Sequence, residues 1–127
     1  MKRGVLLFAH GARDPRWAAP FEAVAARVRE RDASLEVRLA YLELMAPTIA
    51  ESGRELALAG CDRVDIVPLF LGAGGHVRQD LPALVRTLEQ AHPLVQYRLH
   101  PAIGELEPVI AAMADAAHQL ATEHSLE

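Results

Sequence analysis

The sequence predicts an α/β fold, a single domain with a four-stranded parallel sheet and helices on both faces. Four short apolar runs alternate with helical stretches along the 127 residues, and short connections join them. Alternation of this kind implies right-handed crossovers between parallel strands. The apolar fraction of 51% and the charged fraction of 24% are ordinary for a globular chain, and a chain of this length can bury one core.

The first strand and the first helix are expected near the start of the chain. Residues 4–10 (GVLLFAH) form a continuous apolar run, which is typical of a strand buried on both faces. Asp14 is the expected N-cap of the next helix, and Pro15 suits its first position. Pro20 then requires either a kink or a later start. The helical stripe has spacings of four, three and four residues and consists of Trp17, Phe21, Val24 and Val28.

The remaining elements follow in the same order. Strands are expected at residues 35–43, 63–71 and 95–101. Helices are expected at residues 47–59 and 105–120, and a further helix is expected to run from the glycine-rich loop to residue 90. Pro47 is expected to open the second helix, and Gly60 to close it. Asp80 is expected to cap the third helix, with Pro82 in its first turn.

Three residues of metal-ligating types are expected at one edge of this sheet. His10 ends the first strand, Glu43 ends the second, and His76 lies in the loop that leaves the third, each 33 positions after the last. One strand–helix–strand unit takes about 30 residues, and ligands bind beyond the carboxyl ends of parallel strands. Two imidazoles and a carboxylate suit cobalt, nickel, iron or zinc. Taken singly, each residue also has a structural interpretation, as a carbonyl-bonded histidine or a solvated carboxylate.

Composition excludes several classes of function. Cys61 is the only cysteine, so the chain has no internal disulfide and no multi-thiolate metal site, and a reducing cytoplasm is the expected location. The net charge of −4 argues against a nucleic-acid partner. No stretch approaches the roughly 20 apolar residues of a membrane span. The GAGG loop lacks the lysine of a phosphate loop and the spacing of a dinucleotide fingerprint, so we predict no organic cofactor.

Three segments carry a resemblance to a known family. LLFAHGARDPRW, AYLELMAPTI and VPLFLGAGGHVRQDLP are similar to the signature segments of the small CbiX-type class II chelatases, and the similarity continues to HPAIGEL. These resemble the sirohydrochlorin chelatases, which insert cobalt or iron into a tetrapyrrole for cobalamin or sirohaem. The resemblance implies a chelatase-like, flavodoxin-like arrangement of the sheet. Longer members fuse two such domains, so this chain resembles the short form that works as a homodimer.

The resemblance also implies roles for particular residues. His10 and His76 match the family's metal-binding histidines, and Glu43 matches the acidic position that assists them. We expect these three residues to form the catalytic set, with the divalent metal ion as a substrate: Co²⁺ first, Fe²⁺ or Ni²⁺ as alternatives. Because the tetrapyrrole carries carboxylates, Arg13 and Arg78 are candidates to bind them. Gly74 and Gly75 are expected to leave room for a flat ligand.

Several alternatives stay open from sequence. His100, at the end of the fourth strand, is either a further ligand or a structural residue. A metal carrier without catalysis would use the same histidines. A histidine-dependent phosphate-transfer enzyme is weaker, because alanine precedes His10 where an arginine would bind phosphate. We expect the domain to span residues 1–123, followed by a polar tail, 124–127, whose end is typical of a cloning scar.

Overall fold

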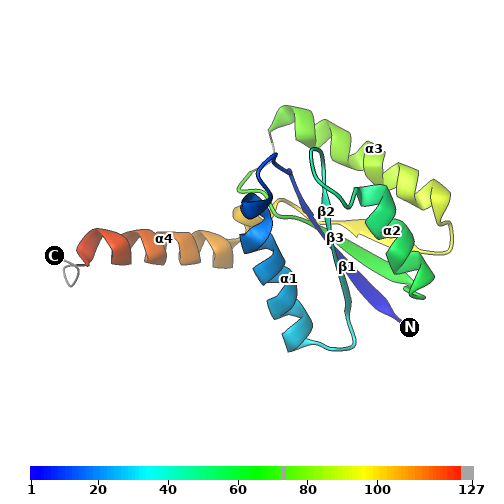
Figure 1. Cartoon of the computed structure of the whole chain (residues 1–127), viewed down its shortest axis with the longest axis horizontal. Helices are drawn as coiled ribbons and strands as arrows, with labels where there is room; N and C mark the ends of the chain where they lie inside the picture. Colours follow the sequence, from blue (N-terminus) through cyan, green and yellow to red (C-terminus); the bar gives the residue numbers. More distant parts are fainter. Residues whose placement is uncertain (73, 124–127) are drawn as a thin grey trace.

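The structure, a computed structural model, describes residues 1–72 and 74–123 and contains a four-stranded parallel sheet (Figure 1). The strands are β1 (Arg3–Ala9), β2 (Glu36–Tyr41), β3 (Arg63–Pro68) and β4 (Gln96–Leu99), in the order β2-β1-β3-β4. β1 pairs in parallel with both β2 and β3, and β3 pairs with β4. The predicted fold class is therefore confirmed.

The helices lie on both faces of this sheet. They are α1 (Ala19–Arg31), α2 (Ile49–Leu58), α3 (Gly75–Ala91) and α4 (Glu107–Thr122), with short 3-10 helices η1 (Pro15–Ala18) and η2 (Ile103–Glu105). α1 covers one face, α2 and α3 cover the other, and α4 extends away from the sheet (Figure 1). Within the described ranges, no helix has both the length and the apolar character needed to cross a bilayer.

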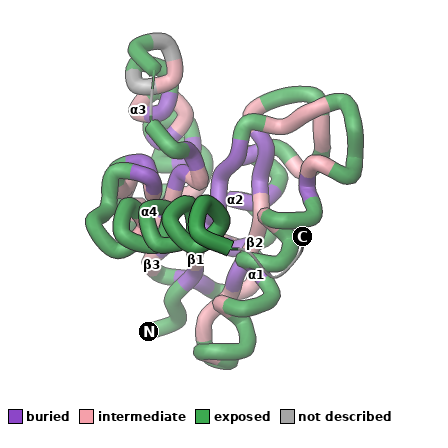
Figure 2. Tube along the Cα trace, turned by 90° about the vertical axis from the view of Figure 1, so that its left-hand side faces the viewer, coloured by how far each residue is buried: buried purple, intermediate pink, exposed green. Residues whose placement is uncertain are grey.

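Two apolar layers hold the helices to the sheet (Figure 2). The larger layer lies between the sheet and α2 and α3, and Leu6, Phe8, Leu56, Val64 and Ile66 are fully buried in it. The smaller layer lies under α1 and centres on Leu7, Ala25 and Val37. Successive strand residues thus enter opposite layers, as the pleat of a strand requires. Cys61 is 3% exposed just before β3, and burial raises the pKa of its thiol.

The first two helices begin later than a proline-based prediction places them. Asp14 caps η1, because its carboxylate accepts from the backbone N–H of Arg16 at 2.9 Å. α1 then starts at Ala19, so Pro20 falls in its first turn and causes no kink. The expectation that Pro47 opens the second helix is wrong: α2 begins at Ile49. Thr48 is its N-cap, in a reciprocal capping box with Glu51.

The third helix begins earlier than predicted. α3 starts at Gly75, with Gly74 as its N-cap, so Asp80 lies inside the helix and is not a cap. Pro82 is also internal. The helix is held across this proline by packing, since its buried residues Leu81, Val85 and Leu88 recur at spacings of four and three. His76 therefore lies in the first turn of α3 and not in the preceding loop.

Leu56 and Leu58 on α2 provide a matched test of the larger layer. Leu56 is fully buried, whereas Leu58 is 76% exposed. We expect Leu56→Ala to lower the free energy of unfolding by about 2–5 kcal/mol, because it leaves a cavity in a packed core. Leu58→Ala should change it by less than about 0.5 kcal/mol. Urea unfolding measures both values, and equal losses would contradict the assignment of this layer as the core.

Candidate metal and substrate site

The loops that follow β1 and β2 are joined beyond the ends of the strands. The backbone N–H of Leu42 donates to the carbonyl of Ala9 at 2.9 Å, and that of Glu43 donates to the carbonyl of His10 at 3.0 Å. Two backbone hydrogen bonds thus join the loops just beyond the last paired residues of the strands, Ala9 and Tyr41. As a result, His10 and Glu43, 33 positions apart in sequence, are neighbours at the carboxyl edge of the sheet.

Gly11 allows this close approach. Its φ is +96°, in the region that favours glycine, and a Cβ built on it would lie 1.8 Å from the carbonyl oxygen of Glu43. Any side chain at this position would push the two loops apart. The glycine that follows His10 is therefore a condition for the pairing of His10 with Glu43.

The imidazole of His10 stacks on the ring of Phe70. The ring centroids are 4.3 Å apart with an interplanar angle of 30°. Phe70 is 3% exposed, and its carbonyl accepts from the N–H of Gly104 at 2.9 Å, which fixes it at the end of β3. His10 itself is exposed, and its ring nitrogens make no hydrogen bond to any described residue. The phenyl ring therefore holds the plane of an imidazole whose nitrogens remain available.

Sequence reasoning did not identify Phe70 as part of the site. One signal was present: an aromatic residue immediately before the glycine-rich loop, at the end of a strand. It was hidden because Phe70 also continues the apolar run of β3. Only the approach of the first loop to this position distinguishes a ring that supports His10 from one that fills the core.

Glu43 lies in a tight loop with its side chain exposed. Its carboxylate makes no hydrogen bond or ion pair with the residues that the structure describes. Leu44 has a φ of +67°, the Ala46–Pro47 peptide is cis, and the N–H of Tyr41 donates to the carbonyl of Pro47 at 2.9 Å. The loop is thus closed on itself and presents a carboxylate at the same edge as His10.

The structure places the backbone of His76 but not its side chain. His76 is the second residue of α3, and the side chains of His76 and Arg78 lie outside the described part of the structure. Among the side chains that are described, no three His, Cys, Asp or Glu groups stand close enough to hold a metal ion. The set of His10, Glu43 and His76 therefore stays a prediction, of which the structure brings the first two members together.

The glycines just before and at the start of α3 are not explained by packing against the residues that the structure describes. A Cβ at Gly72, Gly74 or Gly75 would meet no atom of the described residues within 4 Å, and none of the three has a positive φ. All three are exposed. They leave open surface beside the first turn of α3, in which His76 is the second residue.

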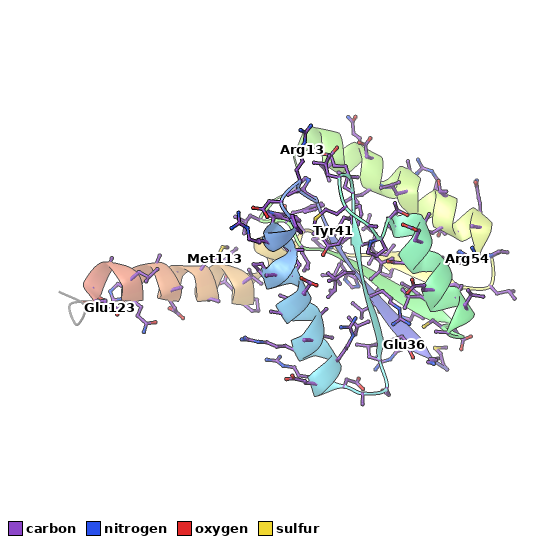
Figure 3. All side chains as sticks on the ribbon, viewed as in Figure 1. Arg13, Glu36, Tyr41, Arg54, Met113 and Glu123 are labelled. Carbon is purple, nitrogen blue, oxygen red and sulfur yellow. The ribbon has the colours of Figure 1, made fainter. Side chains whose placement is uncertain are left out.

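Aromatic and apolar side chains flank the edge on the side of β2. The ring of Trp17 lies 4.5 Å from that of Phe21 and 6.3 Å from that of Tyr41, and burial raises the pKa of Tyr41. Arg13 is exposed and lies, in the view of Figure 3, at the same end of the molecule as the start of α3. A cavity of about 330 Å³ beyond Tyr41 is lined by Phe8, Tyr41, Leu42, Thr48, Ile49, Ala50 and Leu84.

The side chain of His100 interacts with Asp65. Its Nε2 lies 2.8 Å from Oδ1 of Asp65, which also accepts from Nε of Arg98 at 3.0 Å. Burial raises the pKa of Asp65, but the hydrogen bonds from His100 and Arg98, with the charge of Arg63, outweigh it and hold that pKa below its usual value. Of the two alternatives for His100, this geometry favours the structural one.

Comparisons with known proteins identify similar chains. The CbiX family model matches residues 4–120. A sirohydrochlorin cobaltochelatase of Methanopyrus kandleri is 33% identical over 81 residues, which cover 64% of this chain and 57% of that protein. A crystal structure from Marinobacter aquaeolei VT8, described as a CbiX protein of cobalamin (vitamin B12) biosynthesis, is 33% identical. It has a TM-score of 0.82 and covers 94% of this chain and 97% of its own.

This chain matches only part of the length of several of these proteins. The chain spans about three fifths of the length of the curated relatives it matches, for example 57% and 62% of the first two. The sirohydrochlorin chelatase SirB of Bacillus subtilis subspecies spizizenii, solved with cobalt, matches with a TM-score of 0.81 over 95% of this chain but only 52% of SirB. At 23% identity, this match shows the shared fold alone.

Gly11 and Gly72 give a test of the loop contact. We expect Gly11→Ala to lower the free energy of unfolding by about 2 kcal/mol or more, because the added methyl group meets the carbonyl of Glu43 at a positive φ. Gly72→Ala is the matched control, since its Cβ meets nothing within 4 Å. It should change stability by less than about 0.5 kcal/mol. Thermal or urea unfolding measures both, and a stable Gly11→Ala protein would contradict the contact.

The lowered pKa of Asp65 predicts that the folded protein loses stability in acid. Because its folded pKa lies below the unfolded value of about 3.9, its contribution is present above that pH and is lost as pH falls through the folded pKa. At pH 7 we expect Asp65→Asn to cost about 1–2 kcal/mol.

Urea unfolding across a pH series provides the measurement. The difference between wild type and Asp65→Asn should shrink below about pH 4. Glu30→Gln, at an exposed position on α1, serves as the control and should show no difference at either end. A difference for Asp65→Asn that persists unchanged into strong acid would contradict the role given to its carboxylate.

Proposed function

This chain belongs to the CbiX family, and we propose that it is a chelatase, which inserts a divalent metal ion into sirohydrochlorin or a related tetrapyrrole. The names of its relatives support this reaction. The observation that carries the proposal is the hydrogen-bonded pairing of His10 with Glu43 at the carboxyl edge, beside the open glycine surface at the start of α3. Residues 1–123 would act together as one chelatase domain.

The reaction needs a metal ligand and a proton acceptor in the same place. Insertion forms bonds from M²⁺ to the ring nitrogens and releases the two pyrrolic N–H protons, so one metal complex and two protons replace the ion and the free base. A neutral imidazole can ligate the metal or accept a proton near neutral pH. We assign ligation to His10 and His76, and we assign proton acceptance and charge balance to these histidines with Glu43.

Two features of His10 favour this assignment. Stacking on Phe70 holds the imidazole plane, so ligation does not require the ring to be ordered first. No residue that the structure describes hydrogen-bonds its nitrogens, so ligation displaces none of these residues. Two imidazoles with one carboxylate also leave open coordination positions, through which the ion can pass to the macrocycle.

The flat, acidic macrocycle matches the surface around these residues. Gly74 and Gly75 leave space that no described residue fills within 4 Å of a Cβ built on them. Arg13 is exposed, and with Arg78 it would bind substrate carboxylates through paired N–H donors. Negative net charge elsewhere on the chain makes such local cations more necessary for an acidic substrate.

We propose Co²⁺ as the metal substrate, with Fe²⁺ or Ni²⁺ as alternatives, because the curated relatives are named cobaltochelatases. The ligand set alone favours no single one of these ions. We also propose a cytoplasmic location and a homodimer. The homodimer rests on the resemblance to the short, single-domain form of the family.

An optical assay tests the proposed metal-insertion activity. Protein, Co²⁺ and sirohydrochlorin are mixed, and insertion is followed through the change in the tetrapyrrole absorption spectrum. We expect His10→Ala and His76→Ala each to lower the rate at least about 100-fold, because each removes a ligand and a proton acceptor. His118→Ala, at an exposed position on α4, is the matched control and should keep the wild-type rate.

Other results of the insertion assay would contradict either the chelatase activity or the role of a particular histidine. If wild-type protein inserts metal no faster than buffer does, the chelatase proposal fails. Titration with Co²⁺ then tests the alternative, a metal carrier, which should bind the ion in wild type and lose it in His76→Ala. An unchanged insertion rate in His76→Ala would remove that residue from the mechanism. An unchanged insertion rate in His10→Ala would remove His10 from the mechanism, and its stacking on Phe70 would then have no role in metal insertion.

A further inference from the structure

The ring of Phe70 joins the buried core to the histidine at the carboxyl edge. Phe8 is fully buried, and its ring centroid lies 6.1 Å from that of Phe70 with an interplanar angle of 57°. On the other side, Phe70 is stacked on the imidazole of His10 at 4.3 Å and 30°. Any group that fixes Phe70 therefore also fixes the plane of His10.

The backbone at Phe70 is held from two directions. β3 ends at Pro68, and the N–H of the next residue, Leu69, donates to the carbonyl of Phe8 at 2.7 Å. The carbonyl of Phe70 itself accepts from the N–H of Gly104 at 2.9 Å. Gly104 belongs to η2, which lies between the end of β4 and the start of α4 (Figure 1). The ring that supports His10 thus depends on a segment far along the chain.

Gly104 is buried and leaves no room for a side chain. A Cβ built on it would lie 2.1 Å from the carbonyl oxygen of Leu71 and 2.4 Å from its Cα. Both are backbone atoms, so they cannot move aside without displacing the peptide that follows Phe70. η2 is also anchored, because the neighbouring Ala102 is buried in the larger layer. A methyl group on Gly104 would therefore push Leu71, and with it Phe70, away from η2.

The stack favours the form of His10 that binds an ion. The lone pair that ligates a metal lies in the plane of the imidazole, so the tilt of the ring decides the direction from which the ion is bound. Ligation also draws electron density out of the imidazole, and the face of a phenyl ring is its negative side. Phe70 therefore stabilises the metal-bound ring more than the free ring. Without this support, the imidazole has to be ordered when the ion binds.

We propose that Gly104 and Phe70 are a pair of positioning residues for metal transfer. Gly104 excludes a side chain beside Leu71 and so keeps Phe70 stacked on the imidazole of His10. Both residues are buried and act through His10, so their effect falls on the binding and transfer of the ion and not on the binding of the macrocycle. This inference rests on the proposed function and adds a role for η2, a segment that carries none of the proposed catalytic residues.

Proton resonances of the histidine rings test the stack without metal or substrate. A proton that lies over the face of a phenyl ring is shifted upfield, and His10→Ala identifies the signals of His10 among the six histidines. In the metal-free wild type, we expect these signals upfield of those of His118, which is exposed on α4. Phe70→Leu should remove the upfield shift, and Gly104→Ala should reduce it. A wild-type His10 without the shift overturns the proposal.

Each variant has a matched control away from the carboxyl edge. Gly60→Ala also strains the backbone, because Gly60 has a φ of +89°, but its Cβ would meet no atom of the described residues within 4 Å. It is the control for Gly104→Ala. Leu56→Ala is the control for Phe70→Leu, since Leu56 is buried in the same layer but lies against Gly4, at the other end of β1. Both controls should lower stability and keep the shift of His10.

Cobalt titration and insertion kinetics measure the consequence for the ion. We expect Phe70→Leu and Gly104→Ala each to raise the Kd for Co²⁺ at least about fivefold and to lower kcat at least about tenfold. The KM for sirohydrochlorin should stay within about twofold of wild type, because neither residue contacts the macrocycle. The two controls should keep all three constants within about twofold. Circular dichroism shows which variants fold.

The results distinguish this inference from the chelatase activity itself. An active wild type whose Kd for Co²⁺ and kcat are unchanged in Phe70→Leu overturns the inference and leaves the chelatase intact, and this holds even when Gly104→Ala does not fold. Equal changes in Gly104→Ala and Gly60→Ala also overturn it, since they would reflect stability alone. If the wild type binds Co²⁺ but inserts no metal, the proposed function fails, and a raised Kd in Phe70→Leu still supports the positioning of His10.

Discussion

The arrangement of the site depends on the parallel pairing of β1 with both of its neighbours. Because β1 is central, the register on each side fixes where three loops leave the sheet. Backbone hydrogen bonds continue past the strand ends, from Leu42 to Ala9 and from Glu43 to His10. Gly11 permits this continuation, since its missing side chain leaves space for the carbonyl of Glu43.

Because of this pairing, His10 and Glu43, which are 33 positions apart in sequence, are neighbours at the carboxyl edge of the sheet. The exposed residues His10 and Glu43 are joined through their backbones at this edge, and the buried ring of Phe70 stacks on the imidazole. Neither side chain is neutralised by a described residue. The proposed roles of His10 and Glu43 in metal ligation and proton acceptance rest on this placement of their backbones at one edge.

The same topology explains what lies outside the site. β1 leads to β2 through α1, whereas β2 leads back across the sheet to β3 and then to β4, so right-handed connections put α2 and α3 together on the opposite face. Among the helices that the structure describes, α1 covers the first face, and α4, which follows the last strand, points outward.

The sequence by itself determined the fold class, the strand positions and the edge at which His10 and Glu43 lie, because the alternation of apolar runs and the recurrence of one unit every 33 positions are local patterns. It does not place the starts of α2 and α3, because prolines such as Pro47 and Pro82 favour the first turn of a helix but do not require it. Tertiary structure decided the stacking of Phe70 on His10 and the pairing of His100 with Asp65. Both contacts depend on the register between strands distant in sequence, and local composition does not encode that register.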